Sequence, residues 1–218
     1  MFIQKVFRSF GGKPFVVLFD TTKIVRCKSF KMNEHSGAVA KKLEKLTGAP
    51  LEAYARPPHA YIFSDILVSG FLSRLMDYNM AAATVLANQL FFNELGYQVF
   101  VTNIEIKKGK QHGQIAAIQS TDKYDMLRAQ GTNGASYAVD TQSIIQKLQT
   151  WDEMYGIIIF GADKDCCDIE FLELPIDVLP LAHEIYHFCP DSVERGAGSI
   201  TTLEAAIEAM HGLFLWWK

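Results

Sequence analysis

The sequence predicts an α+β fold: a mixed, mostly antiparallel sheet with helices packed on it. Two observations support this prediction. In the C-terminal two thirds, short apolar runs joined by tight turns indicate β-hairpins, and segments with helical spacing flank them. The order helix, strand, turn, strand, helix occurs at residues 80–130 and again at 141–188. Hairpins interleaved with helices are typical of the α+β class.

The N-terminal part of the chain gives fewer signals. Two short β-rich runs within residues 13–27 flank Asp20-Thr21-Thr22, which predicts a hairpin. Ser36 to Leu46 has apolar residues at helical spacing, with Ser36 as the cap, and Gly48 ends this predicted helix.

A loose domain boundary is expected after that helix. Residues 49–70 contain three prolines and one β-like run, Ala60 to Phe63. We therefore expect an N-terminal α+β subdomain at residues 1–75 and a second α+β domain at residues 76–218.

The first half of the second domain should begin with a long helix, Met80 to Leu95, capped by Asn79. This segment is apolar around most of its circumference, so we expect it to be buried. The following elements are a hairpin that turns at Lys108-Gly109-Lys110, with strands Gln98–Ile106 and Gln114–Ile118, and a short helix, Asp122–Ala129.

The second half of that domain repeats this order. The expected elements are a helix at Thr141–Tyr155, strands at Ile157–Phe160 and Cys167–Leu174, a helix at Thr201–Met210 and a last strand at Leu213–Trp217. Because side chains alternate along a strand, Trp216 and Trp217 should point to opposite faces of the sheet.

Composition excludes several classes of function. The formal net charge is −3, so no surplus of Lys and Arg is available for broad nucleic-acid binding. Neither a signal-peptide core nor an apolar run long enough for a membrane helix is expected. The four cysteines show no CxxC spacing, which favours reduced thiols and a cytoplasmic location.

The run His183-Glu184-x-x-His187 suggests a metal site. On a helix, two histidines one turn apart can share a zinc ion, and the Glu between them can act on bound water. Pro180 and Pro190 flank the run closely, so the helix that carries it is short. No third ligand follows in a recognised pattern, so no metal is expected, and a zinc-dependent hydrolase with Glu184 as its catalytic base is an alternative.

Several separated motifs resemble a bacterial family, domain of unknown function 4253. They are the segment Tyr186-His187-Phe188-Cys189-Pro190-Asp191, the Gly196-x-Gly198 turn and the closing Trp216-Trp217. Asp125 to Arg128 and Trp151 to Gly156 also fit, so the resemblance covers about residues 80–218. Lys218 stands where the family has Asp. The resemblance implies no reaction, and it does not require histidine at positions 183 and 187.

Polar residues from loops and helix ends form a second candidate site. An arginine with several carboxylates suits either a structural ion-pair network or a site for a small polar ligand. The candidate ligand-binding residues are Asp125, Arg128, Asn133, Tyr137, Glu184, Asp191 and Glu194. Cys189 is expected to be a buried, inert thiol.

The sequence therefore favours a bacterial, cytoplasmic, non-enzymatic domain that binds a protein partner and needs no cofactor. Toxin-neutralising immunity proteins are an example, by fold-level analogy alone. A flat apolar or acidic surface would support this hypothesis. The alternatives are the zinc hydrolase and binding of a small polar ligand around Arg128 and Asp191.

Overall fold

The computed structural model describes residues 3–8, 14–19, 33–62 and 66–218, and the chain divides into two compact units, 1–31 and 32–218. In the first unit, β1 (Ile3–Arg8) pairs antiparallel with β2 (Pro14–Phe19). This hairpin was not expected. The hairpin predicted around Asp20 shares the strand β2, whereas its turn and second strand lie outside the described residues.

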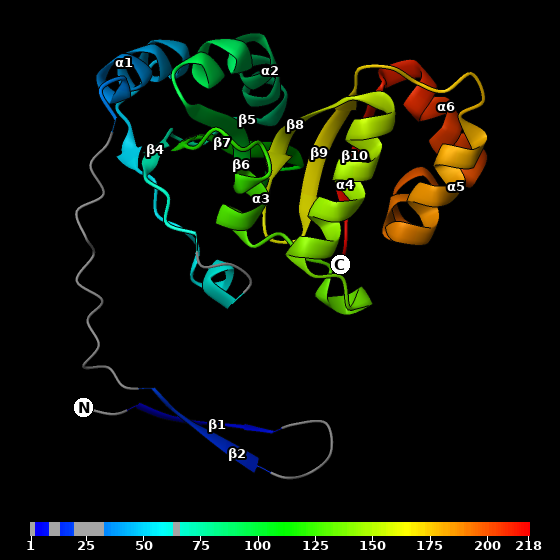
Figure 1. Cartoon of the computed structure of the whole chain (residues 1–218), viewed down its shortest axis with the longest axis horizontal. Helices are drawn as coiled ribbons and strands as arrows, with labels where there is room; N and C mark the ends of the chain where they lie inside the picture. Colours follow the sequence, from blue (N-terminus) through cyan, green and yellow to red (C-terminus); the bar gives the residue numbers. More distant parts are fainter. Residues whose placement is uncertain (1–2, 9–13, 20–32, 63–65) are drawn as a thin grey trace. The chain divides into compact units, whose positions relative to one another are not determined.

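The described residues of the second unit form an eight-stranded sheet in the order β10-β9-β8-β6-β7-β4-β3, with β5 paired to β7 (Figure 1). All neighbours are antiparallel except β6 and β8, which are parallel at Val101 and Gly161. The bounds are β3 Glu52–Ala53, β4 Gly70–Leu72, β5 Met76–Asp77, β6 Tyr97–Lys107, β7 Lys110–Gln119, β8 Ile157–Ala162, β9 Cys166–Phe171 and β10 Gly212–Trp216. The α+β prediction is confirmed.

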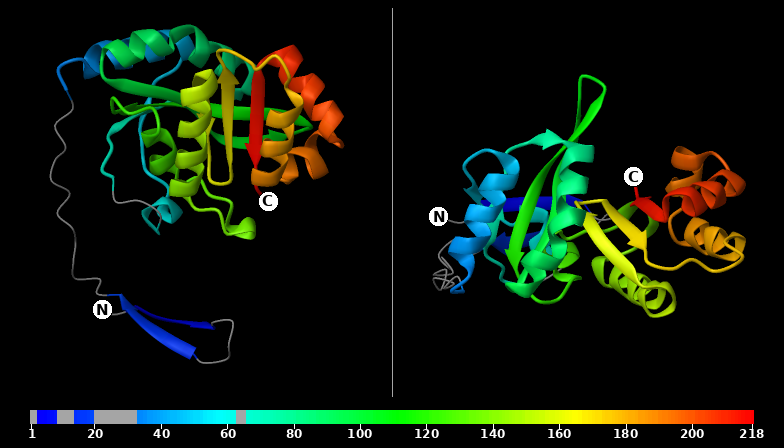
Figure 2. Two further views of the ribbon diagram at one scale, coloured as in Figure 1. Left: turned by 45° about the vertical axis from the view of Figure 1, so that its right-hand side comes forward. Right: turned by 90° about the horizontal axis from the view of Figure 1, so that it is seen from above.

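Helices cover this sheet unevenly. They are α1 Ser36–Thr47, α2 Tyr78–Glu94, α3 Asp125–Gln130, α4 Thr141–Tyr155, α5 Leu179–Phe188 and α6 Ile200–Met210, with a π-helical turn at Ser192–Ala197. Helices α1 and α2 pack on the β6–β7 half of one face, and α3 and α4 pack on the other face. Helices α5 and α6 lie beyond β10 and share the second core with α3 and α4 (Figure 2). Seen from above, α2 and α4 lie on opposite sides of the sheet (Figure 2).

Helix α4 has the predicted bounds, Thr141–Tyr155, and local features of its sequence explain both ends. The side chain of Asp140 accepts a hydrogen bond from the Ser143 amide at 2.7 Å and so caps α4. Ile144, Leu148 and Trp151 are fully buried at helical spacing. Gly156 ends the helix with φ of 63°, a conformation that glycine adopts without strain.

Helix α2 departs from its prediction in two ways. It begins two residues early because Asp77, rather than Asn79, caps it by accepting from the Met80 amide at 3.2 Å. It is also not buried all round, since Leu90 is 73% exposed. The helix forms an outer layer on the sheet, so only the side that carries Ala81, Val85 and Phe92 is buried.

The segment before residue 75 joins the same sheet through β3 and β4. The β-like run at Ala60 instead belongs to a 3-10 helix, Pro58–Ile62, and Phe63 lies outside the described residues. Arg56 supports this loop by donating to the carbonyls of Ala60 at 2.8 Å and Ile66 at 3.1 Å. The expected division into subdomains at residues 1–75 and 76–218 stays a prediction.

Candidate binding surface

Two open grooves flank β10, the last strand of the sheet as described. The first, here called the face groove, has a volume of about 550 Å³ and lies over the exposed face of β9 and β10. The second, the edge groove, has a volume of about 220 Å³ and lies between β10, the π-helical turn and α6. Phe214 and Trp216 line both grooves.

The alternation of side chains along β10 creates this surface. Leu213 and Leu215 are buried in the core, whereas Phe214 is 41% exposed and Trp216 is half-buried on the opposite face. Trp217 is 2% exposed, and its indole donates to the Phe188 carbonyl at 3.2 Å. The expectation that the two indoles take opposite sides is confirmed.

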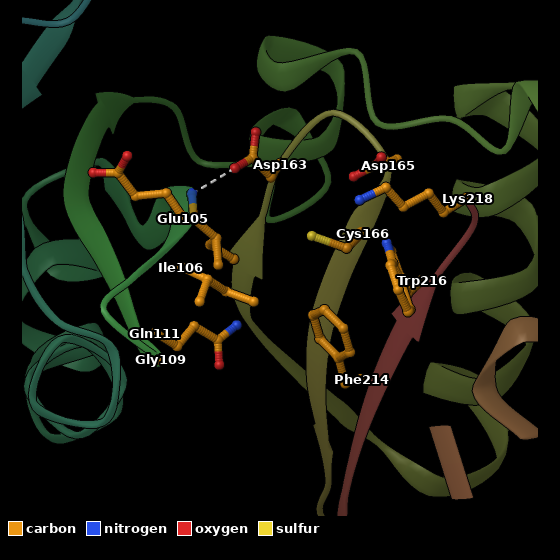
Figure 3. A pocket seen from close by; sticks show the side chains of 11 residues that line it. Glu105, Ile106, Gly109, Gln111, Asp163, Asp165, Cys166, Phe214, Trp216 and Lys218 are labelled. Carbon is orange, nitrogen blue, oxygen red and sulfur yellow. Dashed lines mark hydrogen bonds between the residues drawn. The ribbon is translucent and has the colours of Figure 1, made fainter. Parts of the chain in front are cut away.

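The face groove combines apolar and acidic side chains. The far end of the β6–β7 hairpin supplies Ile104, Glu105 and Ile106 to one side, and β9 and β10 supply the other side (Figure 3). Asp163 and Asp165 line the end of the groove at the top of Figure 3, where Asp163 accepts a hydrogen bond from the Ile104 amide at 2.7 Å. Burial raises the pKa of Asp163, although two backbone amides oppose that shift.

One cation of the chain already lies in this groove. The ammonium of Lys218 is 5.5 Å from the ring centroid of Trp216, within cation–π range. The Trp216 ring and the acidic side chains therefore provide an environment that a positively charged group can occupy.

A buried carboxylate lies next to the groove floor. Asp168 on β9 is 4% exposed and is the partner of Phe214 across the β9–β10 ladder. Burial raises its pKa to about 7, and interaction with the Tyr78 hydroxyl only partly opposes this. Burial also raises the pKa of the neighbouring Cys166 thiol, so that thiol stays protonated and is a poor nucleophile.

The His-Glu-x-x-His run lies on the outer side of α5. Leu181, Ala182 and Ile185 are buried on the inner side of this helix, and both histidines are exposed. The His187 ring Nδ1 lies 2.7 Å from the His183 carbonyl, and Glu184 forms an ion pair with Lys147 at 2.9 Å. Among the described residues, no group of three His, Cys, Asp or Glu side chains could hold a metal ion.

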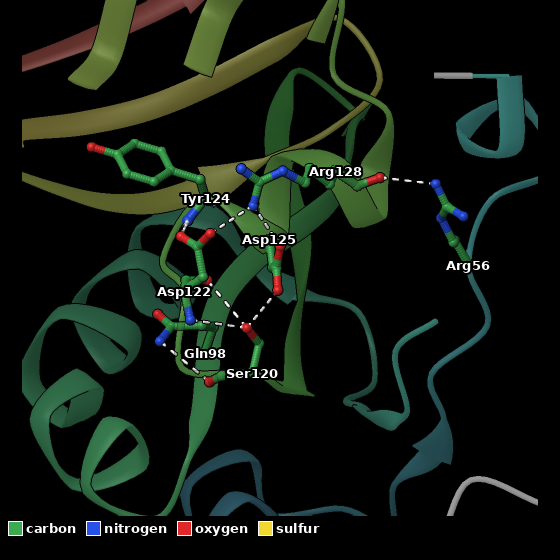
Figure 4. A network of polar contacts seen from close by, with 7 residues as sticks. All are labelled: Arg56, Gln98, Ser120, Asp122, Tyr124, Asp125 and Arg128. Carbon is green, nitrogen blue, oxygen red and sulfur yellow. Dashed lines mark hydrogen bonds and ion pairs between the residues drawn. The ribbon is translucent and has the colours of Figure 1, made fainter. Parts of the chain in front are cut away.

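The side chains of Asp125 and Arg128, two of the polar candidates, lie together on α3. The Arg128 guanidinium donates to Asp125 at 2.6 Å and to Asp122 at 2.7 Å, and Ser120 donates to Asp125 at 2.7 Å (Figure 4). These bonds hold the end of β7 to the start of α3. The arginine is thus engaged by its own carboxylates rather than presented to a ligand.

Tyr137 and Asp191 form a separate cluster. Asp191 is 1% exposed and accepts from the Tyr137 hydroxyl at 2.8 Å, the Lys218 amide at 2.7 Å and the Arg195 side chain at 3.1 Å. The hydrogen bond to Asp191, more than burial, raises the pKa of Tyr137.

The remaining candidates bond to other groups, although Glu194 is near enough to Tyr137 for its charge to help raise the pKa of that residue. Asn133 donates to the Gly131 carbonyl at 2.8 Å, Glu194 accepts from the Tyr186 hydroxyl at 3.2 Å, and Glu184 pairs with Lys147. Asp191 lines the edge groove, whereas Arg128 lines neither groove. Sequence reasoning missed Phe214, Asp163 and Asp165; the alternation along the last strand was the one signal that pointed to Phe214.

Cys189 lies inside this framework. It is fully buried, and its thiol donates to the Trp216 carbonyl at 3.0 Å while its sulfur accepts from the Trp216 amide at 3.3 Å. Burial raises the pKa of this thiol. The Cys-Pro-Asp segment therefore ties the end of α5 to β10.

Together these features define an α+β domain with an open, aromatic sheet surface at its C-terminal end. A family model, the domain of unknown function DUF4253, matches residues 114–218, from β7 to the last residue. This part of the chain is therefore similar to that family, and the resemblance that the motifs indicated over residues 80–218 is matched from residue 114 onward. No curated protein and no solved structure matches the chain. None of the described helices is both long enough and apolar enough to cross a membrane.

Proposed function

We propose that this domain is a non-enzymatic binding module of the bacterial cytoplasm, and that it binds a protein segment carrying Lys or Arg beside apolar residues. The observation that supports this most directly is the pairing of Lys218 with the Trp216 ring in a groove that also contains Asp163 and Asp165. A basic side chain of a partner can take the position of Lys218, because its charge and shape are alike.

The chemistry of the surface favours binding over catalysis. The groove is open and is lined by the exposed Phe214 and the half-buried Trp216, and aromatic side chains often dominate binding energy at protein interfaces. The thiols of Cys166 and Cys189 have pKa values raised by burial, and Arg128 and Asp191 are engaged within the fold. The contacts that these four side chains make within the fold explain their positions without a catalytic role.

Selection of phage-displayed random peptides on the immobilised full chain tests the proposal. We expect enriched peptides to combine Lys or Arg with apolar residues, and to bind less tightly as salt concentration rises. Their affinity should fall about tenfold or more with Phe214→Ser, as for an interface anchor, and also fall with Asp165→Asn.

Leu90→Ser is the matched control, because Leu90 is an exposed apolar side chain on α2 and lines neither groove. Peptides that lose binding with Leu90→Ser and keep it with Phe214→Ser would refute the proposed surface. So would a selection that enriches no peptide.

A further inference from the structure

The outer edge of β10 has backbone groups that point away from the sheet. In the β9–β10 ladder, the Trp217 amide donates to the Asp165 carbonyl at 2.9 Å and the Phe171 amide donates to the His211 carbonyl at 2.7 Å. Residue pairs in an antiparallel ladder alternate between hydrogen-bonded and non-hydrogen-bonded, so the backbone amides and carbonyls of residues 211, 213, 215 and 217 point toward β9. The amide and carbonyl of Phe214 therefore point to the outer edge, where the described sheet has no further strand.

The backbone groups of Trp216, the next residue that points to the outer edge, already have partners. Both backbone groups of Trp216 bond to the Cys189 thiol, which closes that end of the edge. Gly212 lies at the other end and has no side chain to block an approach. The edge groove runs beside this stretch and is lined mainly by apolar groups: Ala197, Leu203, Ala206, Met210 and Leu213.

We infer that the partner segment binds in extended conformation as an added strand on the outer edge of β10, paired to the backbone of Phe214 in the edge groove. This inference rests on the proposed function and states its binding mode. Addition of a strand to a sheet edge satisfies backbone donors and acceptors, and alternate side chains provide specificity.

The two grooves match the two sets of side chains that an extended segment presents. One set would contact Leu203, Ala206 and Met210 in the edge groove. The alternate set would lie beside Phe214 and Trp216, toward the acidic side chains of the face groove, where a Lys or Arg is complementary in charge. We therefore expect basic and apolar residues to alternate with a period of two.

The helices beside β10 favour an extended segment over a second copy of the chain as the partner at this edge. Helices α5 and α6 lie beyond the sheet edge on the side of β10 (Figures 1 and 2). A second copy that joined its own β10 to this edge would bring its α6 into the same space, because a twofold axis perpendicular to the sheet keeps equivalent faces together. An extended segment has no such helix.

A peptide from the phage selection serves as the probe in two experiments. N-methylation of a peptide residue whose amide pairs with Phe214 should weaken binding about tenfold, whereas N-methylation of the next residue should not. Ala206→Trp should fill the edge groove and weaken binding, while Ala209→Trp, an exposed position on the same helix, is the control. Hydrogen exchange of the Phe214 amide should slow on binding.

The outcomes separate the two proposals. A peptide that requires Phe214 and Asp165 yet tolerates every N-methylation and Ala206→Trp overturns strand addition and leaves the proposed function standing. Failure to select any peptide overturns both. Position-dependent loss on N-methylation, together with a protected Phe214 amide, supports strand addition.

Discussion

The carboxylate of Asp168 lies directly over Gly161, its partner across β8 and β9. A Cβ atom at position 161 would overlap the Asp168 side chain, so the close approach requires glycine. Gly161 is also the residue through which β8 pairs with Val101 of β6, the parallel contact between the two halves of the sheet. The buried Asp168 side chain therefore occupies the space that a side chain at position 161 would need, beside the parallel contact between β6 and β8.

Gly161→Ala tests this relationship. We expect it to lower the free energy of unfolding by about 1–3 kcal/mol, because the added methyl must displace a buried side chain or strand. Denaturation by urea, followed by circular dichroism, measures the change.

Gly37→Ala is the matched control for that substitution. Gly37 lies in α1 with open space around its Cα, so alanine should stabilise the helix by about 0.5–1 kcal/mol. Equal stability of Gly161→Ala and the wild-type protein would show that the Asp168 side chain is not held over this glycine.

Asp168 should make stability depend on pH. Its folded-state pKa is about 7, whereas an unfolded Asp titrates near ~4, so the folded state binds more protons between these values. The free energy of unfolding should therefore fall as pH rises from about 4 to 7 and stay level above that range. The size of the effect is on the order of 1–4 kcal/mol.

Asp168→Asn removes this titration, so the variant should be more stable than the wild type at pH 8 and lack the slope between pH 4 and 7. Urea titrations at a series of pH values measure both effects. Glu170→Gln, on the same strand but partly exposed, is the control. If Asp168→Asn kept the wild-type pH slope, another group would be its source.

Asp191 should be the most sensitive of the polar candidates proposed from sequence. Asp191→Ala removes an acceptor for Tyr137, Lys218 and Arg195 and leaves these donors without it. We expect a loss of about 2–4 kcal/mol in the free energy of unfolding, since the position is buried. Glu194→Ala, on the exposed π-helical turn, should change it by less than about 0.5 kcal/mol. Similar losses in the two variants would contradict this ranking.

The elements that sequence predicted well are those whose signals are local. Helix α4 has its cap, its apolar stripe and its terminating glycine within the segment itself. Strands β3, β4 and β5 are two or three residues long, too short to show an alternation, and they exist only because they pair with β7 or with each other. The exposure of Leu90 likewise depends on what lies beyond α2, which the helix sequence does not encode.

The candidate site shows the same division. Sequence predicted that Trp216 and Trp217 take opposite faces, because alternation is a local property. It did not predict that β10 would be an edge strand or that the β6–β7 hairpin would supply a wall of the face groove, because both depend on long-range pairing. The polar candidates were grouped by residue type and by their expected places in loops and at helix ends, and the structure places them in separate networks.

The His-Glu-x-x-His run allows a last prediction. We expect protein purified without a histidine tag to contain less than ~0.1 equivalent of zinc, because a structural or catalytic site needs a third protein ligand and Glu184 is paired with Lys147. The variant His183→Ala/His187→Ala should keep its stability within about 0.5 kcal/mol, since both rings are exposed. Added zinc should shift the Tm of neither protein. A rise in the Tm of the wild type that the double variant lacks would instead establish zinc binding at these histidines, since a ligand stabilises only the state that binds it.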